Sequence, residues 1–94
     1  MDWDTVSMKF SMGQRQETIY SYTVLFEPAE EGGYVVHVPS LPGCVTQGET
    51  FEEARAMAED VIQLYIETLK DSGDDVPVER ENIIVSRVAT KIFA

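Results

Sequence analysis

The sequence predicts an α+β domain of order βββαβ, in which a three-stranded antiparallel meander precedes one helix and a fourth strand. Three observations support this fold class. Short stretches in residues 19–47 alternate apolar and polar side chains, residues 54–69 carry apolar side chains at helical spacing, and a β-branched run follows at residues 83–89. The 94 residues make one small domain, for which a partner or a second copy would add useful buried surface.

The first two strands are predicted at residues 19–27 and 34–38. Aromatic and β-branched residues on one side of the first strand indicate one buried face. The residues on that side are Tyr20, Tyr22, Val24 and Phe26. The connection between the two strands, residues 28–33, is polar and rich in glycine, which predicts an antiparallel hairpin.

A turn rich in proline and glycine separates the second strand from a third strand at residues 44–47. Pro39 and Pro42 have no N–H to donate to a strand ladder, and Gly43 can adopt the positive φ that such a turn requires. We interpret these three residues, with Gly48 after the third strand, as residues that shape the chain and not as ligand contacts.

The helix is predicted to begin after Thr50, which opens a capping box. The Thr50 side chain can accept from the backbone N–H of Glu53, whose carboxylate can reach back to the Thr50 N–H. Met57, Leu64 and Ile66 widen the apolar arc to roughly 200°, at about 100° per residue. These flanks are either buried in the domain or cover a sheet edge or another subunit. The main apolar face consists of Ala54, Ala58, Val61, Ile62, Tyr65 and Leu69.

The remaining segments define the ends of the domain. A turn-rich linker at residues 71–77 leads to the fourth predicted strand; if that strand lies parallel to the first, the helix covers one face of the sheet and the other face is bare. Residues 1–18 form an N-terminal extension that is either an extra strand or a mobile tail, so the domain is expected at residues 19–94. The broad apolar arc and the bare face predict a homodimer or higher oligomer.

The net charge is the most unusual feature of the composition. The net charge is -10, and residues 27–81 alone hold fourteen acids against three bases. Such a field repels phosphate backbones and attracts basic partners, so we expect no direct contact with nucleic acid. The simpler interpretation, that acidity keeps a small protein soluble, stays open.

The sequence offers no arrangement for catalysis. Cys44 is the only cysteine and His37 the only histidine; both flank the same turn, but structural thiols are far commoner than catalytic pairs. We therefore expect no catalytic residue, no cofactor and no metal site. A lone cysteine is typical of a cytoplasmic protein, and no apolar run approaches the ~20 residues of a membrane span.

Residues 20 to about 89 contain an ordered set of strand, turn and helix-cap residues. The set is Tyr22, Val24, Glu27, Gly33, Tyr34, Pro39, Leu41, Pro42, Gly43, Cys44, Thr46, Gly48, Thr50, Glu53 and Ala54. With this set the chain resembles the HicB-like antitoxins. The resemblance implies a βββαβ fold similar to a trimmed RNase H domain, and it implies neutralisation of HicA, a small basic ribonuclease, by covering its active site. Fuller family members add a C-terminal DNA-binding domain; this chain ends at Ala94 and is expected to be a short form without it.

Three functions remain as hypotheses. The first is an antitoxin for a HicA-type ribonuclease, and the second is an orphan homo-oligomeric scaffold or small-ligand-binding protein without a toxin. The third, a degenerate metal-dependent hydrolase, is the weakest, because two-metal chemistry needs several converging carboxylates and the predicted strands supply only Glu27.

Six glutamates are candidates for contacting basic groups on a toxin. They lie at the first hairpin and at the start of the helix. The competing interpretation is that they are solvated, with the two in the first helical turn gaining ~0.3–1 kcal/mol from the helix N-terminus. The six are Glu27, Glu30, Glu31, Glu49, Glu52 and Glu53.

Overall fold

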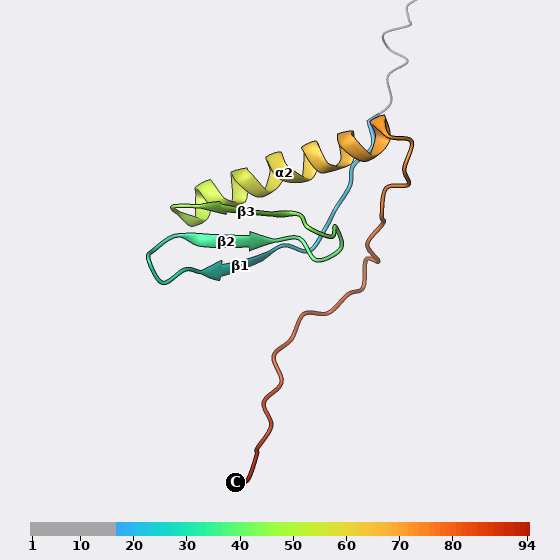
Figure 1. Cartoon of the computed structure of the whole chain (residues 1–94). Helices are drawn as coiled ribbons and strands as arrows, with labels where there is room; N and C mark the ends of the chain where they lie inside the picture. Colours follow the sequence, from blue (N-terminus) through green and yellow to red (C-terminus); the bar gives the residue numbers. More distant parts are fainter. Residues whose placement is uncertain (1–16) are drawn as a thin grey trace, which may run out of the picture.

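The computed structural model describes residues 17–94 as a three-stranded antiparallel sheet with one helix across it (Figure 1). The strands are β1 (Leu25–Pro28), β2 (Tyr34–His37) and β3 (Val45–Gly48), in the spatial order β1-β2-β3, and the helix is α2 (Phe51–Asp71). This confirms the predicted α+β class with one helix on one face. The possible extra strand or tail at residues 1–16 lies outside the described residues.

The strand register separates a covered face from a bare face. Val36 lies opposite Phe26 on β1 and Thr46 on β3, and it packs with Ala54 and Ala58 of α2 at 0% exposure. Adjacent residues on a strand point to opposite faces. The neighbouring cross-strand row, Leu25, His37 and Val45, therefore lies on the face that α2 does not cover.

The first strand is shorter than predicted because its partner ends early. β2 stops at His37, where the chain enters a turn in which Val38 N–H donates to the Cys44 carbonyl at 3.1 Å. Residues 19–24 consequently have no ladder partner in the described chain. Tyr22 and Val24 nevertheless pack against the core, as predicted for their side of the strand.

The turn at residues 38–44 builds a second core cluster. Leu41 is fully buried, and Val38 and Cys44 beside it are 2% and 3% exposed. Tyr65 of α2 donates its hydroxyl proton to the Pro42 carbonyl at 2.7 Å, which ties the turn to the helix. The turn therefore supplies the buried residues of one of the two core clusters as well as connecting two strands.

The helix begins at the predicted cap, with one different partner. Thr50 Oγ1 accepts from Glu53 N–H at 3.0 Å, as expected, but the Glu53 carboxylate accepts from Glu49 N–H at 2.9 Å and not from Thr50. Of the flanking apolar residues, Ile66 is buried, whereas Met57 and Leu64 are 38% and 63% exposed. Part of the broad apolar arc therefore faces solvent.

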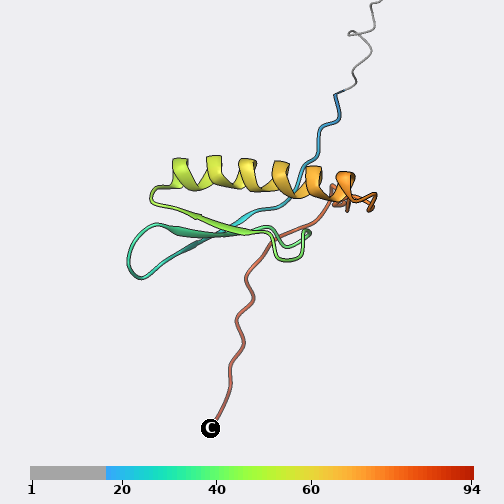
Figure 2. The same ribbon diagram turned by 45° about the horizontal axis from the view of Figure 1, so that its top comes forward.

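The fourth strand predicted at residues 83–89 is not formed. The described chain after α2 contains no strand, and residues 80–94 are exposed and run away from the sheet (Figures 1 and 2). A β-strand needs a neighbouring strand for its backbone hydrogen bonds, and this segment pairs with no strand of the described chain. We call residues 82–94 the C-terminal tail.

Candidate functional site

A depression lies where the β1–β2 hairpin meets the end of β3 and the start of α2. It has a volume of about 370 Å³, and Glu31, Glu49 and Glu53 are among the residues that line it. Tyr34 and Gln47 are among the other lining residues, and none of the residues that line it is basic. We call this depression the acidic cleft.

Backbone packing brings these carboxylates together. Tyr34 pairs with Gly48 across β2 and β3, which places the hairpin beside the start of the helix. Gly33 approaches Gly48 so closely that a Cβ on Gly33 would lie 2.6 Å from the Gly48 carbonyl oxygen. The hairpin itself is closed by Ala29 N–H donating to the Gly33 carbonyl at 3.0 Å. Glu31 thus lines the same depression as Glu49, although β2 and β3 both lie between them in sequence.

The six candidate glutamates fall into three groups. Glu31, Glu49 and Glu53 line the cleft, and Glu30 and Glu52 are exposed at the hairpin tip and in the first turn of α2. Glu27 stands apart on the bare sheet face, where its carboxylate lies 3.1 Å from Nε2 of His37. One Glu53 oxygen is already bonded to a backbone N–H, so Glu31 and Glu49 are the freer carboxylates.

The residues predicted to shape the chain do so in different ways. Gly43 has a φ of 78° in the turn, as predicted, and Pro39 and Pro42 lie beside it. Gly48 has a steric role: a Cβ there would lie 2.5 Å from the backbone nitrogen of Ala54, so the absence of a side chain allows α2 to lie close to β3. Tyr34 packs its ring edge against Phe51, with centroids 6.2 Å apart.

The structure separates Cys44 from His37, the two residues considered above as a nucleophile and its base. Cys44 is buried under α2, and that burial raises the pKa of its thiol, whereas His37 interacts with Glu27 on the other face of the sheet. Within residues 17–94, no three His, Cys, Asp or Glu side chains are grouped to hold a metal ion. In the same residues, no helix has the length and apolar character needed to cross a membrane.

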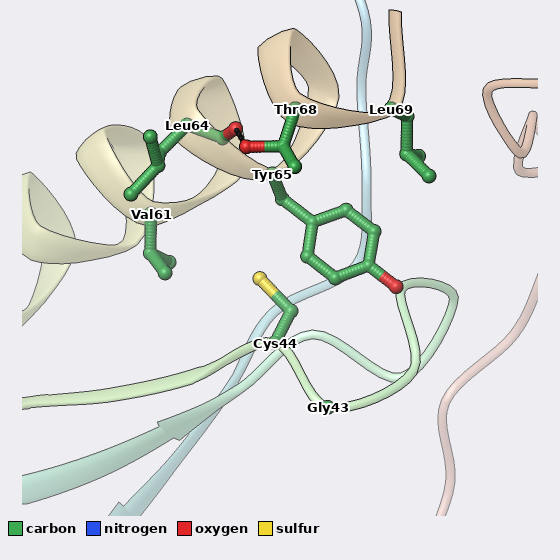
Figure 3. A pocket seen from close by; sticks show the side chains of 7 residues that line it. All are labelled: Gly43, Cys44, Val61, Leu64, Tyr65, Thr68 and Leu69. Atoms are coloured by element: carbon green, nitrogen blue, oxygen red, sulfur yellow. Dashed lines mark hydrogen bonds between the residues drawn. The ribbon is translucent and has the colours of Figure 1, made fainter. Parts of the chain in front are cut away.

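An apolar pocket of about 250 Å³ opens between the second half of α2 and the turn (Figure 3). The Cys44 sulfur points from the turn toward the helix, between Val61 and Tyr65, and Leu64 stands at the exposed side. The pocket suits an apolar group and offers no charged side chain.

Glu79 is a structurally important residue that the sequence did not reveal. Its carboxylate accepts from the Thr23 backbone N–H at 2.8 and 2.9 Å, from the Thr23 hydroxyl, and from the Ser40 hydroxyl at 2.8 Å. Tyr22 adds a bond from its hydroxyl to the Pro77 carbonyl at 2.6 Å. The linker between α2 and the C-terminal tail, residues 72–81, is therefore anchored through Pro77 and Glu79 to the residues just before β1 and to the turn. An acid in an acidic linker gives no sequence signal for this role.

Replacing Glu79 by glutamine is expected to lower stability at pH 7 more than at pH 3. The hydrogen bonds from the Thr23 side chain, then from its backbone, and from Ser40 hold the pKa of Glu79 below its usual value, and desolvation opposes them only partly. A lowered folded-state pKa stabilises the fold above the unfolded pKa of ~4.3, and that contribution is lost as pH falls through the folded pKa. Urea unfolding followed by circular dichroism at both pH values measures the effect.

Glu81→Gln is the matched control for this change, because Glu81 is exposed in the same linker. It should leave the urea midpoint nearly unchanged at both pH values. Equal midpoints for Glu79→Gln and the unsubstituted chain at pH 7 would contradict the anchoring role.

Comparison with known proteins places the chain in a family. A protein-family model described as "HicB_like antitoxin of bacterial toxin-antitoxin system" matches residues 22–91. A UPF0150 protein of Synechocystis sp. is 48% identical over 67 residues, which cover 71% of this chain and 82% of that protein. A UPF0150 protein of Thermoplasma acidophilum is 48% identical over 56 residues, covering 60% and 81%.

A named antitoxin is also similar. Antitoxin HicB 1 of Photorhabdus laumondii is 42% identical over 57 residues, which cover 61% of this chain but 37% of that longer protein. The family match spans β1, β2, β3, α2 and most of the segment after the helix. The chain therefore belongs to the HicB-like antitoxins of bacterial toxin–antitoxin systems.

Proposed function

We propose that this chain is a cytoplasmic antitoxin that neutralises a small basic ribonuclease of the HicA type by covering its active site. The observation that carries the proposal is the acidic cleft, in which the fold of an antitoxin family collects Glu31, Glu49 and Glu53 without a basic residue beside them. A nuclease that binds RNA needs basic groups, and a cleft of the opposite sign is chemically suited to occupy them.

The rest of the surface supports the encounter with such a toxin. Glu30 and Glu52 extend the negative region beyond the cleft, and the net charge of the chain is -10. A field of one sign accelerates association with a partner of the other sign, and salt weakens this steering because the Debye length shortens to about 8 Å at physiological ionic strength. The association rate should therefore fall as salt rises, while dissociation responds less.

Reversing charge inside the cleft is expected to slow toxin binding and to weaken neutralisation. The double variant Glu31→Lys with Glu49→Lys removes the two freer carboxylates and keeps Glu53, which supports the helix start. At low salt we expect its association rate with the toxin to fall at least tenfold, measured by stopped-flow or surface plasmon resonance with the basic protein encoded beside this gene.

The matched control changes the same net charge elsewhere on the molecule. Asp60→Lys with Asp71→Lys places the new charges on exposed positions of α2 outside the cleft. Its association rate should fall clearly less. An equal fall in the association rate for both double variants would mean that the overall charge of the chain, and not the cleft, determines that rate.

Growth of cells that express the neighbouring basic protein tests the proposal as a whole. Co-expression of this chain should restore growth, and the double variant in the cleft should restore it less. Equally poor growth with and without the chain, or a neighbouring protein that is not toxic, would overturn the antitoxin function. Cleavage of RNA by the purified chain with magnesium or manganese, abolished by Glu27→Gln, would instead support a hydrolase.

The apolar pocket in Figure 3 favours a second candidate function. A protein without a toxin partner could use this pocket for a small apolar ligand, or use exposed apolar residues such as Leu64 to assemble as a homo-oligomeric scaffold. This candidate takes the place of the antitoxin if the neighbouring protein is harmless while the chain still self-associates.

A further inference from the structure

The C-terminal tail has the composition of a buried strand but lies in solvent. Ile84, Val88 and Ile92 are 87%, 93% and 85% exposed, and only Ser86 and Thr90 lie between them on the same side of an extended chain. The opposite side carries the two charges of the tail, Arg87 and Lys91, together with Ile83, Val85 and Phe93. One side of the extended tail is therefore uncharged and mainly apolar while the other is mixed, which suits a strand with its uncharged face on a core.

Glu79 is fixed beside the edge of the sheet, and the tail that follows it runs away from the sheet. The Glu79 carboxylate accepts a hydrogen bond from the Thr23 N–H just before β1. The residues after Glu79 nevertheless run away from the sheet in both views (Figures 1 and 2). The tail therefore begins near the β1 edge without pairing along it.

The β1 edge offers a place for one more strand. β1 is an outer strand of the sheet, and in the described chain it pairs only with β2, which leaves the backbone groups along its other edge without a strand partner. Beside it lies a groove of about 470 Å³ between the β1 segment and α2, with an apolar part formed by Val24, Phe26, Ala58 and Ile62 and a polar part that includes Ser21, Arg55 and Glu59. An added strand would hydrogen-bond to the edge and place one face in this groove.

We propose that the tail of one copy forms the fourth strand on the β1 edge of a second copy, and that the exchange is reciprocal. Each sheet then has the βββαβ order that the sequence predicts, with its last strand supplied by the partner. Ile84, Val88 and Ile92 face the groove under α2. The two-fold exchange closes into a dimer and buries both tails.

Charge favours a second copy of this chain as the occupant. The tail contains Arg87 and Lys91 and no acid, whereas residues 17–81 hold fifteen acids against three bases. With the uncharged face in the groove, the two cations lie on the side of the sheet that carries Glu27 and Leu25. The exchanged tails thus place positive charge between two strongly negative bodies that otherwise repel.

The first test is the mass of the full chain in solution. Light scattering at micromolar concentration should give twice the 10.6 kDa chain mass. Val88→Asp should reduce it to the monomer mass, because the carboxylate would lose its water where the uncharged face of the tail packs against the apolar part of the groove. Val78→Asp is the matched control, since Val78 is 84% exposed on the same segment but precedes the tail. It should leave the dimer intact. A monomeric full chain, or a dimer that Val88→Asp leaves intact, would overturn the proposal.

A mixing experiment separates exchange from pairing within one chain. One copy carries Leu25→Cys on β1, and a second, differently tagged copy carries Arg87→Cys on the tail. Mild oxidation should produce the mixed disulfide, and the pair Leu25→Cys with Val78→Cys should not; the unsubstituted chain measures the background from Cys44, which is 3% exposed. A chain that carries both cysteines and closes only internally would show that the tail docks on its own sheet.

These outcomes do not depend on the antitoxin activity. A dimer that Val88→Asp dissociates, in a protein that fails to neutralise any toxin, would leave strand exchange intact and remove the proposed function. A monomeric protein that still neutralises the toxin would do the reverse.

Discussion

Replacing Gly48 by alanine is expected to force α2 away from β3 and to lower the free energy of unfolding by about 3 kcal/mol or more. The new Cβ would lie 2.5 Å from the Ala54 backbone nitrogen and 2.6 Å from its Cα. Both atoms belong to helix backbone, so no side chain can turn aside. Overpacking of a core costs about 1–3 kcal/mol when side chains adjust, and a clash with backbone should reach the upper end or exceed it.

The loss is large for a domain of this size, because small domains are stable by only about 5–15 kcal/mol. Circular dichroism at 222 nm and a urea midpoint measure the change. Gly43→Ala is the informative control: Gly43 has a φ of 78°, but a Cβ added there would meet nothing within 4 Å. It should lose only the ~1–2 kcal/mol of a left-handed alanine and keep the helix packed. Equal stability of the two variants would contradict the steric role of Gly48.

Leu41→Ala should cost about 2–5 kcal/mol, the range for removing a large aliphatic side chain from a packed site. Leu41 is fully buried in the turn between β2 and β3, with Val38 and Cys44 beside it. Tyr65 of α2 packs against the same cluster and donates a hydrogen bond to the Pro42 carbonyl. Because this bond ties the turn to the helix, neither can move far to fill the cavity. Urea unfolding at pH 7 gives the free energy directly.

Leu64→Ala provides the comparison for this cavity. Leu64 is 63% exposed on α2, and its truncation should change the free energy of unfolding by no more than about 0.5 kcal/mol. A loss for Leu41→Ala as small as that for Leu64→Ala would mean that the turn cluster contributes little to the core. Both variants retain the helix cap at Thr50, so the difference isolates burial.

The local features were predictable because their causes are local. The capping residue Thr50 lies three residues from Glu53, whose N–H donates a hydrogen bond to it. The turn after β2 is marked by two residues with restricted backbones, Pro39 and Pro42, and by the conformationally permissive Gly43. The hairpin between β1 and β2 joins neighbours in sequence. In each case the interacting residues are close in sequence, so residue type and spacing are sufficient to predict the contact.

The candidate site was predictable only in part. The six glutamates could be chosen by residue type and by their position near turns, but their grouping depends on the pairing of Tyr34 with Gly48. Glu79 was missed because its partner Thr23 lies 56 residues away and its own neighbours include other acids. No local pattern distinguishes a carboxylate that binds a distant backbone N–H from one that is solvated.

The β-branched run at residues 83–89 indicated that this segment can form a strand, since residue type is a property of the chain alone. Whether it does so depends on an edge to pair with, and an edge exists only once β1, β2 and α2 have packed. Composition likewise established that the chain is acidic, whereas folding placed Glu31, Glu49 and Glu53 in one cleft. The residue pattern and the net charge follow from the sequence alone. Strand pairing and the grouping of carboxylates depend on segments that lie apart in the sequence, and only packing in three dimensions brings these segments together.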